Sequence, residues 1–150
     1  MKRLLFALAI CFVFVSCESK FGDFDKVRFQ GKDISGYWLW VKDENVNGEV
    51  EDEYDGGGEP MLYCFDGDTA TWLGGFGGEY YRDGYIYGFS FDRCYSEVYT
   101  LEIRGNKFFL GGTLWGIVTL EKNDIMRVEC IDDWDHKKYY AIYKRIYGLR

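Results

Sequence analysis

The chain has little of the chemistry that most enzymes use. Its 150 residues contain one histidine, His136, and no Gly-x-Ser-x-Gly, phosphate-loop or paired zinc-ligand motif. A serine-nucleophile triad, a nucleotide-phosphate site and a multi-histidine metal site therefore have no candidates. A cysteine–histidine pair stays open, because Cys130 and His136 are close in sequence, but no orienting motif surrounds them. We expect a protein that is not an enzyme and that carries no cofactor or metal.

A long hydrophobic segment is also missing. The longest apolar run, residues 4–15, is twelve residues long, whereas a membrane-spanning helix needs roughly 20. The run follows two basic residues and is followed by the small side chain of Ser16. This layout is typical of a secretory signal peptide, which we assign to residues 1–16.

The signal ends in a small residue followed by Cys17, and such signals resemble those of bacterial lipoproteins. The resemblance implies that Cys17 is lipidated and becomes the new N-terminus, so that a lipid bilayer is the first expected partner. Residues 17–33 are then expected to form a polar tether, and residues 34–150 the folded domain. The expected location is the cell envelope, in the outer membrane of a Gram-negative bacterium.

Positive charge is scarce. The chain has 18 basic and 25 acidic residues, and residues 1–16 hold two of the basic ones and no acidic one. The mature chain therefore has 16 basic residues against 25 acidic ones, a net charge of −9. Nucleic acids need clustered Lys and Arg, so we expect no nucleic-acid partner.

Helical periodicity is absent from the mature chain, whereas aromatic residues make up 20% of the sequence and glycine occurs 19 times. Aromatic and β-branched residues suit strands, and glycine suits tight turns. The pattern predicts an all-β domain of eight to ten short antiparallel strands. The expected strands are 36–42, 60–66, 69–75, 79–82, 85–91, 95–104, 107–111, 114–121, 125–131 and 138–147.

The strands follow one another with short connections, except for an acidic stretch at 43–59 that we expect to be a long loop. Such a meander must protect its edge strands, and closure into a β-barrel removes the edges. We therefore expect a closed or nearly closed barrel, with an open sandwich as the alternative.

The opening strand contains Gly36-Tyr37-Trp38, and a Gly-x-Trp at this place in an up-and-down barrel resembles the lipocalin signature. The hairpin at 115–130 and the strand at 139–146 are similar to the late hairpin and closing strand of small lipocalin-like envelope lipoproteins. The resemblance implies that Gly36 allows close backbone approach and that Trp38 plugs the barrel floor. It also implies that a basic side chain, Arg145 or Lys144, lies over the Trp38 ring.

Three cysteines are left when the signal and Cys17 are set aside, so at most one disulfide can form. Cys64–Cys94 is the candidate pair, and a buried free thiol at each site is the favoured alternative. Cys130 alternates with Met126 and Val128, so we expect it to be a small buried hydrophobic residue.

Two acidic stretches have some resemblance to metal sites. The first matches the opening half of a calcium loop, but its twelfth position is Tyr54 where a bidentate Glu is needed. The second precedes the last strand and offers one histidine. Solvated loops are the favoured interpretation of both stretches, whose candidate ligands are Asp43, Asn45, Asn47 and Glu51 in the first and Asp132, Asp135 and His136 in the second.

The glycine-rich connection at 74–78 lies beside several aromatic residues. Mobile loops around a rigid barrel are where binding usually concentrates, so we expect a ligand to enter beside 43–59 and 74–78. Phe76, Tyr80 and Tyr81 are the expected contact residues. The acidic surroundings disfavour an anion, so the ligand is expected to be neutral or cationic.

The function expected from these features is non-enzymatic binding by an envelope-anchored domain, either of a small apolar or aromatic ligand or of an envelope partner protein. One alternative is a carbohydrate-binding accessory lipoprotein, which would expose coplanar Trp or Tyr rings. Another is a structural or assembly lipoprotein, which would have a filled barrel. A cavity above ~300 Å³ would favour ligand binding.

Overall fold

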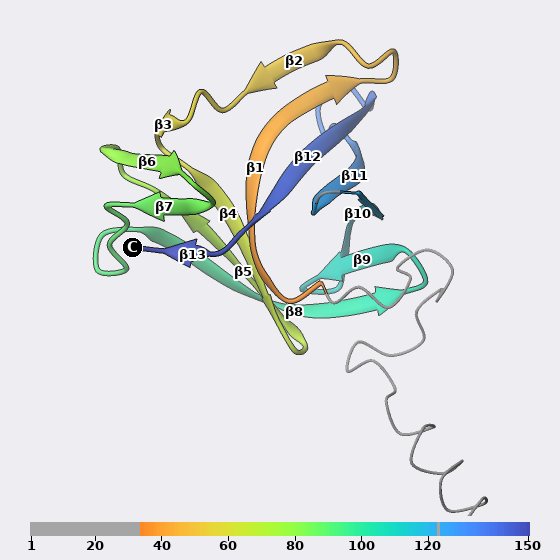
Figure 1. Cartoon of the computed structure of the whole chain (residues 1–150). Helices are drawn as coiled ribbons and strands as arrows, with labels where there is room; N and C mark the ends of the chain where they lie inside the picture. Colours follow the sequence, from red (N-terminus) through yellow and green to blue (C-terminus); the bar gives the residue numbers. More distant parts are fainter. Residues whose placement is uncertain (1–33, 123) are drawn as a thin grey trace, which may run out of the picture.

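The structure, a computed structural model, describes residues 34–122 and 124–150 (Figure 1). The segments predicted to be the signal peptide (1–16) and the tether (17–33), with Cys17, lie outside these described residues. The regular elements within them are all strands, and none of these residues belongs to a helix that could cross a membrane. The strands are β1 (Gly36–Asn45), β2 (Val50–Glu53), β3 (Gly57–Gly58), β4 (Met61–Asp66), β5 (Thr69–Gly74), β6 (Glu79–Arg82), β7 (Tyr85–Tyr87), β8 (Tyr95–Arg104), β9 (Lys107–Leu110), β10 (Thr113–Glu121), β11 (Ile125–Ile131), β12 (Lys138–Ile146) and β13 (Gly148–Leu149).

Eight of these strands close into an antiparallel barrel in the order β1, β4, β5, β8, β9, β10, β11 and β12, and β12 pairs back onto β1. Figure 1 shows them as a ring. Closure gives each of the eight strands two neighbours, which solves the edge problem of a meander. The prediction of an all-β meander closed into a lipocalin-like barrel is confirmed.

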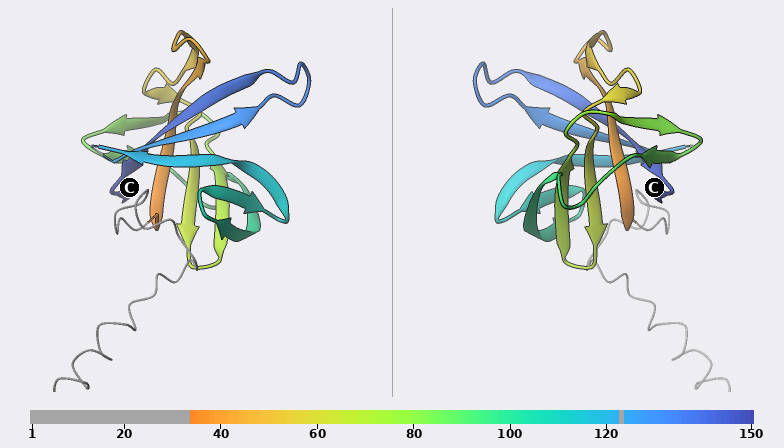
Figure 2. Two further views of the ribbon diagram at one scale, coloured as in Figure 1. Left: turned by 90° about the vertical axis from the view of Figure 1, so that its right-hand side faces the viewer. Right: turned by 90° about the vertical axis from the view of Figure 1, so that its left-hand side faces the viewer.

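Two insertions and the C-terminus build a second sheet against the outside of the barrel (Figures 1 and 2). The strand order of this second sheet is β13-β7-β6-β3. β2 does not belong to it and pairs instead with residues Lys42–Glu44 of β1. The prediction that 43–59 is one long loop is therefore wrong, because β2 and β3 lie within it. All four residues of β2 are exposed, so the strand has no buried face to produce an alternating pattern in the sequence.

The described residues form two hydrophobic clusters, one on each side of the barrel wall. Trp38, Phe65 and Phe108 belong to the cluster inside the barrel. Leu39, Leu62, Leu73, Ile86 and Ile146 form the second cluster, between the barrel and the second sheet. Trp38 and Leu39 are neighbours on β1 and are each only 1% exposed, so this strand is buried on both faces. A strand covered on both faces needs a continuous apolar run, which explains Tyr37–Val41.

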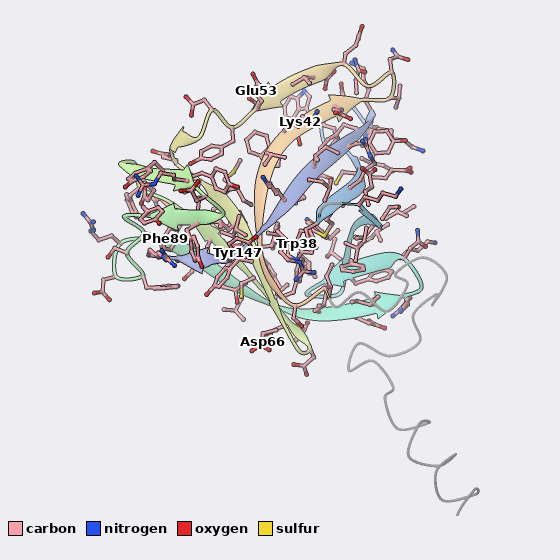
Figure 3. The ribbon with its side chains drawn as sticks, viewed as in Figure 1. Trp38, Lys42, Glu53, Asp66, Phe89 and Tyr147 are labelled. Atoms are coloured by element: carbon pink, nitrogen blue, oxygen red, sulfur yellow. The ribbon has the colours of Figure 1, made fainter. Side chains whose placement is uncertain are left out.

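Trp38 closes one end of the barrel. It pairs across β1 and β12 with Arg145, whose guanidinium carbon lies 4.4 Å from the Trp38 ring centroid. Trp38 Nε1 donates a hydrogen bond of 2.8 Å to the carbonyl of Ile34, and Arg145 donates one to the carbonyl of Ser35. These contacts tie the residues before β1 to the closing strand; Figure 3 labels Trp38 among the barrel side chains.

Gly36 is required here for a different reason from the one the resemblance implies. A Cβ atom at Gly36 would lie 3.6 Å from the nearest atom of Arg145, an ordinary contact distance. Its φ is +108°, however, a backbone conformation that side chains disfavour. The backbone conformation therefore accounts for the glycine, and close approach does not.

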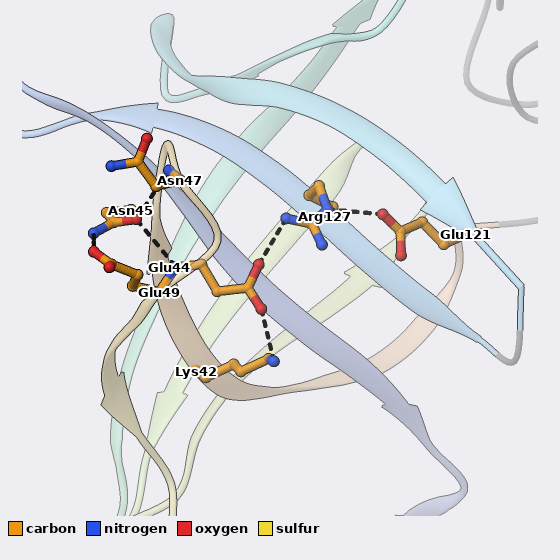
Figure 4. A network of polar contacts seen from close by, with 7 residues as sticks. All are labelled: Lys42, Glu44, Asn45, Asn47, Glu49, Glu121 and Arg127. Carbon is orange, nitrogen blue, oxygen red and sulfur yellow. Dashed lines mark hydrogen bonds and ion pairs between the residues drawn. The ribbon is translucent and has the colours of Figure 1, made fainter.

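An ionic network on the outer face of the barrel stabilises the region where β1 pairs with the closing strand β12 (Figure 4). The buried carboxylate of Glu44 on β1 pairs with Lys42 at 2.6 Å and, across β12, with Arg127 of β11 at 2.9 Å. Arg127 also pairs with Glu121 at 2.7 Å, and its guanidinium carbon lies 5.4 Å from the Tyr140 ring centroid. Hydrogen bonds from Lys42 and Arg127 lower the pKa of Glu44, although burial opposes them.

We expect Trp38→Ala to lower the free energy of unfolding by roughly 3–5 kcal/mol, because it empties the floor of a closed barrel. Urea unfolding of the purified protein measures the change. Arg145→Gln removes the contact over the ring together with the guanidinium bonds to Ser35 and Asp124, and it is expected to cost less, about 1–2 kcal/mol, because the barrel floor stays filled. Equal effects of the two substitutions would contradict the assignment of Trp38 as the main packing residue.

Glu44→Gln is expected to cost about 1–3 kcal/mol at neutral pH, since it weakens charge-assisted bonds to Lys42 and Arg127. The folded-state pKa of Glu44 is lowered, so this contribution is present above its ordinary pKa and is lost as the pH falls through the lowered value. The stability difference between wild type and variant should therefore shrink on acidification. Glu59→Gln, at an exposed position, is the control. A difference that does not depend on pH would exclude this role.

Candidate functional site

The barrel wall divides at the end opposite to Trp38, because β1 changes its neighbour there. The first part of β1, Gly36–Leu39, pairs with β4, whereas its later residues Lys42–Glu44 pair with β2. The β1–β12 pairing also shifts by one residue between Trp40 and Lys42. β1 and β4 therefore separate at this end while β2 pairs with β1, and side chains from all three strands line one space.

That space is a cavity of about 210 Å³, called here the mouth cavity. At ~30 Å³ per water it has room for about seven waters, or a ligand of similar size. Its volume is below the ~300 Å³ stated above to favour ligand binding, so the cavity can hold only a ligand smaller than a drug-sized molecule. Its lining residues are Trp40, Asp43, Asp52, Met61, Leu62, Tyr63, Trp72, Tyr139, Ala141 and Tyr143.

The rest of the barrel interior is filled by aromatic and aliphatic side chains, and the aromatic rings lie directly below the cavity. Tyr63 and Trp115 have ring centroids 4.8 Å apart, and Trp115 and Tyr143 have theirs 5.7 Å apart. Phe65 and Phe108 continue the cluster below, with an edge-to-face contact at 6.1 Å. This aromatic floor limits a ligand to the mouth, so a long acyl chain has no space within the barrel.

Two carboxylates face the mouth cavity. Asp43 and Asp52 are register partners on β1 and β2, and Trp40 Nε1 donates a hydrogen bond of 2.8 Å to Asp43 Oδ1. Burial and the negative charges of Asp52 and Glu51 raise the pKa of Asp43, whereas the bond from Trp40 opposes that rise. Among residues 34–122 and 124–150, no lysine or arginine pairs with either aspartate.

The other polar groups at the mouth are protonated and uncharged at neutral pH. Burial raises the pKa of Tyr63 to about 12 and that of the nearby Cys130 thiol to about 11. The pKa values of Tyr139 and Tyr143 are also raised, mainly by burial. A buried thiol with a high pKa is a poor nucleophile. The cavity is therefore equipped for binding, with aromatic surface, phenol hydroxyls and two carboxylates.

The rim residues expected from the sequence are not at this cavity. Phe76, Tyr80 and Tyr81 do not line it. Tyr80 and Tyr81 belong to β6 of the second sheet, where they alternate between faces. Tyr81 packs in the outer cluster, whereas Tyr80 is exposed.

Phe76 instead stacks on Tyr95, with ring centroids 4.3 Å apart. The two rings border an open surface depression of about 560 Å³ that is also lined by Gly77, Asp92, Arg93 and Cys94. The two aromatic side chains are each more than half exposed. The depression is more open to solvent than the mouth cavity, so the mouth cavity is the stronger candidate site.

The second sheet also presents tyrosines and arginines at the surface. Tyr80 and Tyr87 stack with ring centroids 5.3 Å apart and planes 10° apart. The guanidinium carbon of Arg82 lies 5.0 Å from the Tyr87 ring centroid, and that of Arg150 lies 3.6 Å from the Tyr85 ring centroid. Hydrogen bonds from Arg150 and Arg82 lower the pKa of Tyr87. We call these five residues the tyrosine–arginine face.

The cysteines that the structure describes, Cys64, Cys94 and Cys130, are free thiols. The pairing register argues against the Cys64–Cys94 candidate. Cys64 on β4 lies opposite Thr71 on β5, and Thr71 lies opposite Val98 on β8. Cys94 is four residues before Val98, which displaces it from the level of Cys64 by roughly 13 Å along the strand direction. Disulfide geometry needs Cα atoms closer than about 7 Å.

The calcium-loop residues have local roles instead. The carboxylate of Asp43 accepts a hydrogen bond from Trp40 Nε1. The side chain of Asn45 accepts hydrogen bonds from the amides of Asn47 and Glu49 in the turn after β1. In the second acidic stretch, Asp132 accepts bonds from the amides of Trp134 and Asp135. Within the described part of the chain, no three His, Cys, Asp or Glu side chains gather as a metal site.

Sequence reasoning missed most of the mouth cavity. Alternation along β5 could have found Trp72, because Ala70, two residues earlier, is buried inside the barrel. Asp52 had no such signal, since its position depends on the pairing of an exposed acidic strand with β1.

No known protein-family model matches this chain, and no curated protein or solved structure matches it significantly. The functional argument therefore depends on the geometry of the molecule itself.

Proposed function

We propose that this protein is a non-enzymatic, envelope-anchored lipoprotein that binds a small ligand in the mouth cavity. The observation that supports this most directly is the cavity itself, which lies at the end of the barrel opposite to the Trp38 floor and is lined by aromatic side chains and two carboxylates. Proteins place binding sites in the mouths of β-barrels because a rigid wall holds the contact residues. The raised pKa values of Tyr63 and Cys130 favour binding over covalent chemistry.

The anchor is proposed from the sequence. Several acyl chains on Cys17 would hold the protein at a membrane durably, since each buried CH₂ contributes ~0.8 kcal/mol. The polar residues 17–33 would then separate the barrel from the bilayer. The outer membrane of a Gram-negative bacterium is the proposed location.

A second candidate, carbohydrate binding, is favoured by the tyrosine–arginine face. Tyr80 and Tyr87 have nearly parallel rings on adjacent strands, and Tyr80 is 43% exposed. Exposed parallel rings can stack on sugars, and arginines can donate hydrogen bonds to hydroxyl groups. The guanidinium groups already lie over Tyr85 and Tyr87, however, so a sugar would have to displace them.

We expect Cys17→Ser to release the protein from the membrane fraction and to abolish labelling by a fatty-acid probe. Ser16→Ala, which keeps a small residue before the cysteine, is the matched control and should be labelled like wild type. Labelling of Cys17→Ser at the wild-type level would exclude this anchor.

Ligand binding in the mouth is tested by titrating a panel of small neutral and charged compounds and following Trp fluorescence, since Trp40 and Trp72 line the cavity. Ala141→Leu should fill part of the cavity and weaken binding roughly tenfold or more. Phe76→Ala and Tyr80→Ala, outside the cavity, should leave the affinity unchanged.

The same variants separate the alternatives. Weakening by Tyr80→Ala but not by Ala141→Leu, with a soluble glycan as the ligand, would assign binding to the tyrosine–arginine face. Weakening by Phe76→Ala alone would assign it to the depression beside Tyr95. If no compound of the panel binds, the ligand-binding proposal is wrong.

A further inference from the structure

We propose that the mouth cavity recognises an organic cation, an alkylammonium group held by aromatic rings and two carboxylates; this rests on the proposed function and names the ligand class of that site. Five of the ten lining residues are aromatic, and two are aspartates. None of the lining residues is basic. The combination of ring faces and carboxylates is the one that binds ammonium groups in other proteins.

Aromatic side chains make up half of the residues that line the cavity. Trp40, Tyr63, Trp72, Tyr139 and Tyr143 reach the cavity from β1, β4, β5 and β12, so they surround the space from several sides. Trp40 and Tyr143 are less than a tenth exposed and are held in place by packing. The negative face of an aromatic ring attracts a cation most strongly where water is excluded.

The carboxylates supply the charge. Asp43 on β1 and Asp52 on β2 lie opposite one another in the register, and Glu51 adds a further negative charge that Asp43 senses. Asp43 is half-buried and Asp52 is exposed, and two like charges so close together without a basic partner repel one another. A bound cation would relieve that repulsion, which a neutral or anionic ligand cannot do.

A metal ion is a poorer occupant than an organic cation. Divalent metals prefer six or more oxygen ligands, or sets of several imidazole and thiolate ligands. Within the ranges 34–122 and 124–150, no three such side chains come together. A quaternary alkylammonium group, by contrast, has no N–H to bind water, is weakly hydrated and can use the apolar ring surface that a metal cannot use.

The size of the cavity sets an upper limit on the ligand. Space for about seven waters fits a group such as choline, which has seven non-hydrogen atoms. The aromatic floor prevents a longer molecule from entering the barrel lengthwise. The cationic group would thus enter the cavity, and any further part of its molecule would extend out of the mouth.

The test compares choline with 3,3-dimethylbutan-1-ol, its uncharged analogue of nearly equal shape, in titrations of the full chain. Trp fluorescence and calorimetry measure both affinities. We expect choline to bind roughly tenfold or more tightly than the alcohol. Equal or tighter binding of the alcohol would overturn the cation inference while leaving ligand binding in the mouth intact. Failure of both compounds, and of the neutral panel, would overturn both proposals.

Asp43→Asn is the most informative variant, because the amide oxygen can still accept the hydrogen bond from Trp40 while the charge is lost. We expect it to weaken choline binding roughly fivefold to tenfold and to leave binding of the alcohol unchanged. Asp52→Asn should act in the same direction, which keeps the test valid if one variant is unstable. Asp68→Asn, at an exposed turn of the opposite barrel end, makes the same charge change and should have no effect. An effect of Asp68→Asn equal to that of Asp43→Asn would mean that the overall negative charge attracts the cation.

Phosphocholine distinguishes a free ammonium compound from a phospholipid head group. Its phosphate would lie close to the acidic mouth, so we expect it to bind more weakly than choline. Binding of phosphocholine as tight as that of choline, together with retention on phosphatidylcholine vesicles of a Cys17→Ser variant, would assign the ammonium group to a lipid.

Discussion

The architecture depends on β1 being buried on both faces. Trp38 packs inside the barrel and Leu39 packs under the second sheet, so neighbouring residues of one strand stabilise two different clusters. The same strand pairs with β12, β4 and β2. β1 therefore determines three features of the fold: the closure of the barrel, the attachment of the second sheet and the opening of the mouth.

The mouth is a consequence of these pairings. A strand that pairs with β4 along its whole length would leave a continuous wall, whereas β1 exchanges β4 for β2 after Leu39. The exchange brings Asp52 opposite Asp43 and separates β1 from the start of β4. The carboxylates of the cavity and the space between its walls thus have one cause.

The barrel was predictable from the sequence, because several of its strands alternate between a buried and a more exposed face and β1 is a continuous apolar run. Turn residues such as Asp83 and Gly84 marked the connections, and both have positive φ in the structure. Even the arrangement of Arg145 over Trp38 followed from a family resemblance. β2, β3 and β13 could not be predicted, since they are short, and β2 is fully exposed. Their existence depends on pairing partners that are distant in sequence.

The same reason explains why the ligand contacts expected from the sequence lie away from the mouth cavity. Glycine-rich segments and aromatic residues indicate where a chain can turn and where it can make contacts, but not which sheet the residues join. Tyr80 and Tyr81 became part of the second sheet because β6 pairs with β3 and β7. The sequence does not distinguish the residues that line the cavity from other residues of the same type. Trp40 resembles an ordinary core residue, and Asp52 resembles an ordinary surface residue.

Different residues determine the depth of the cavity and its charge, and this limits how ligand specificity could change. The aromatic floor fixes the depth of the cavity, and any residue removed from it would weaken the inner cluster. The charge of the mouth, by contrast, comes from Asp52 on an exposed strand and from Asp43, whose hydrogen bond an amide can replace. Ligand size is therefore tied to stability, whereas ligand charge is free to vary at little cost to the fold.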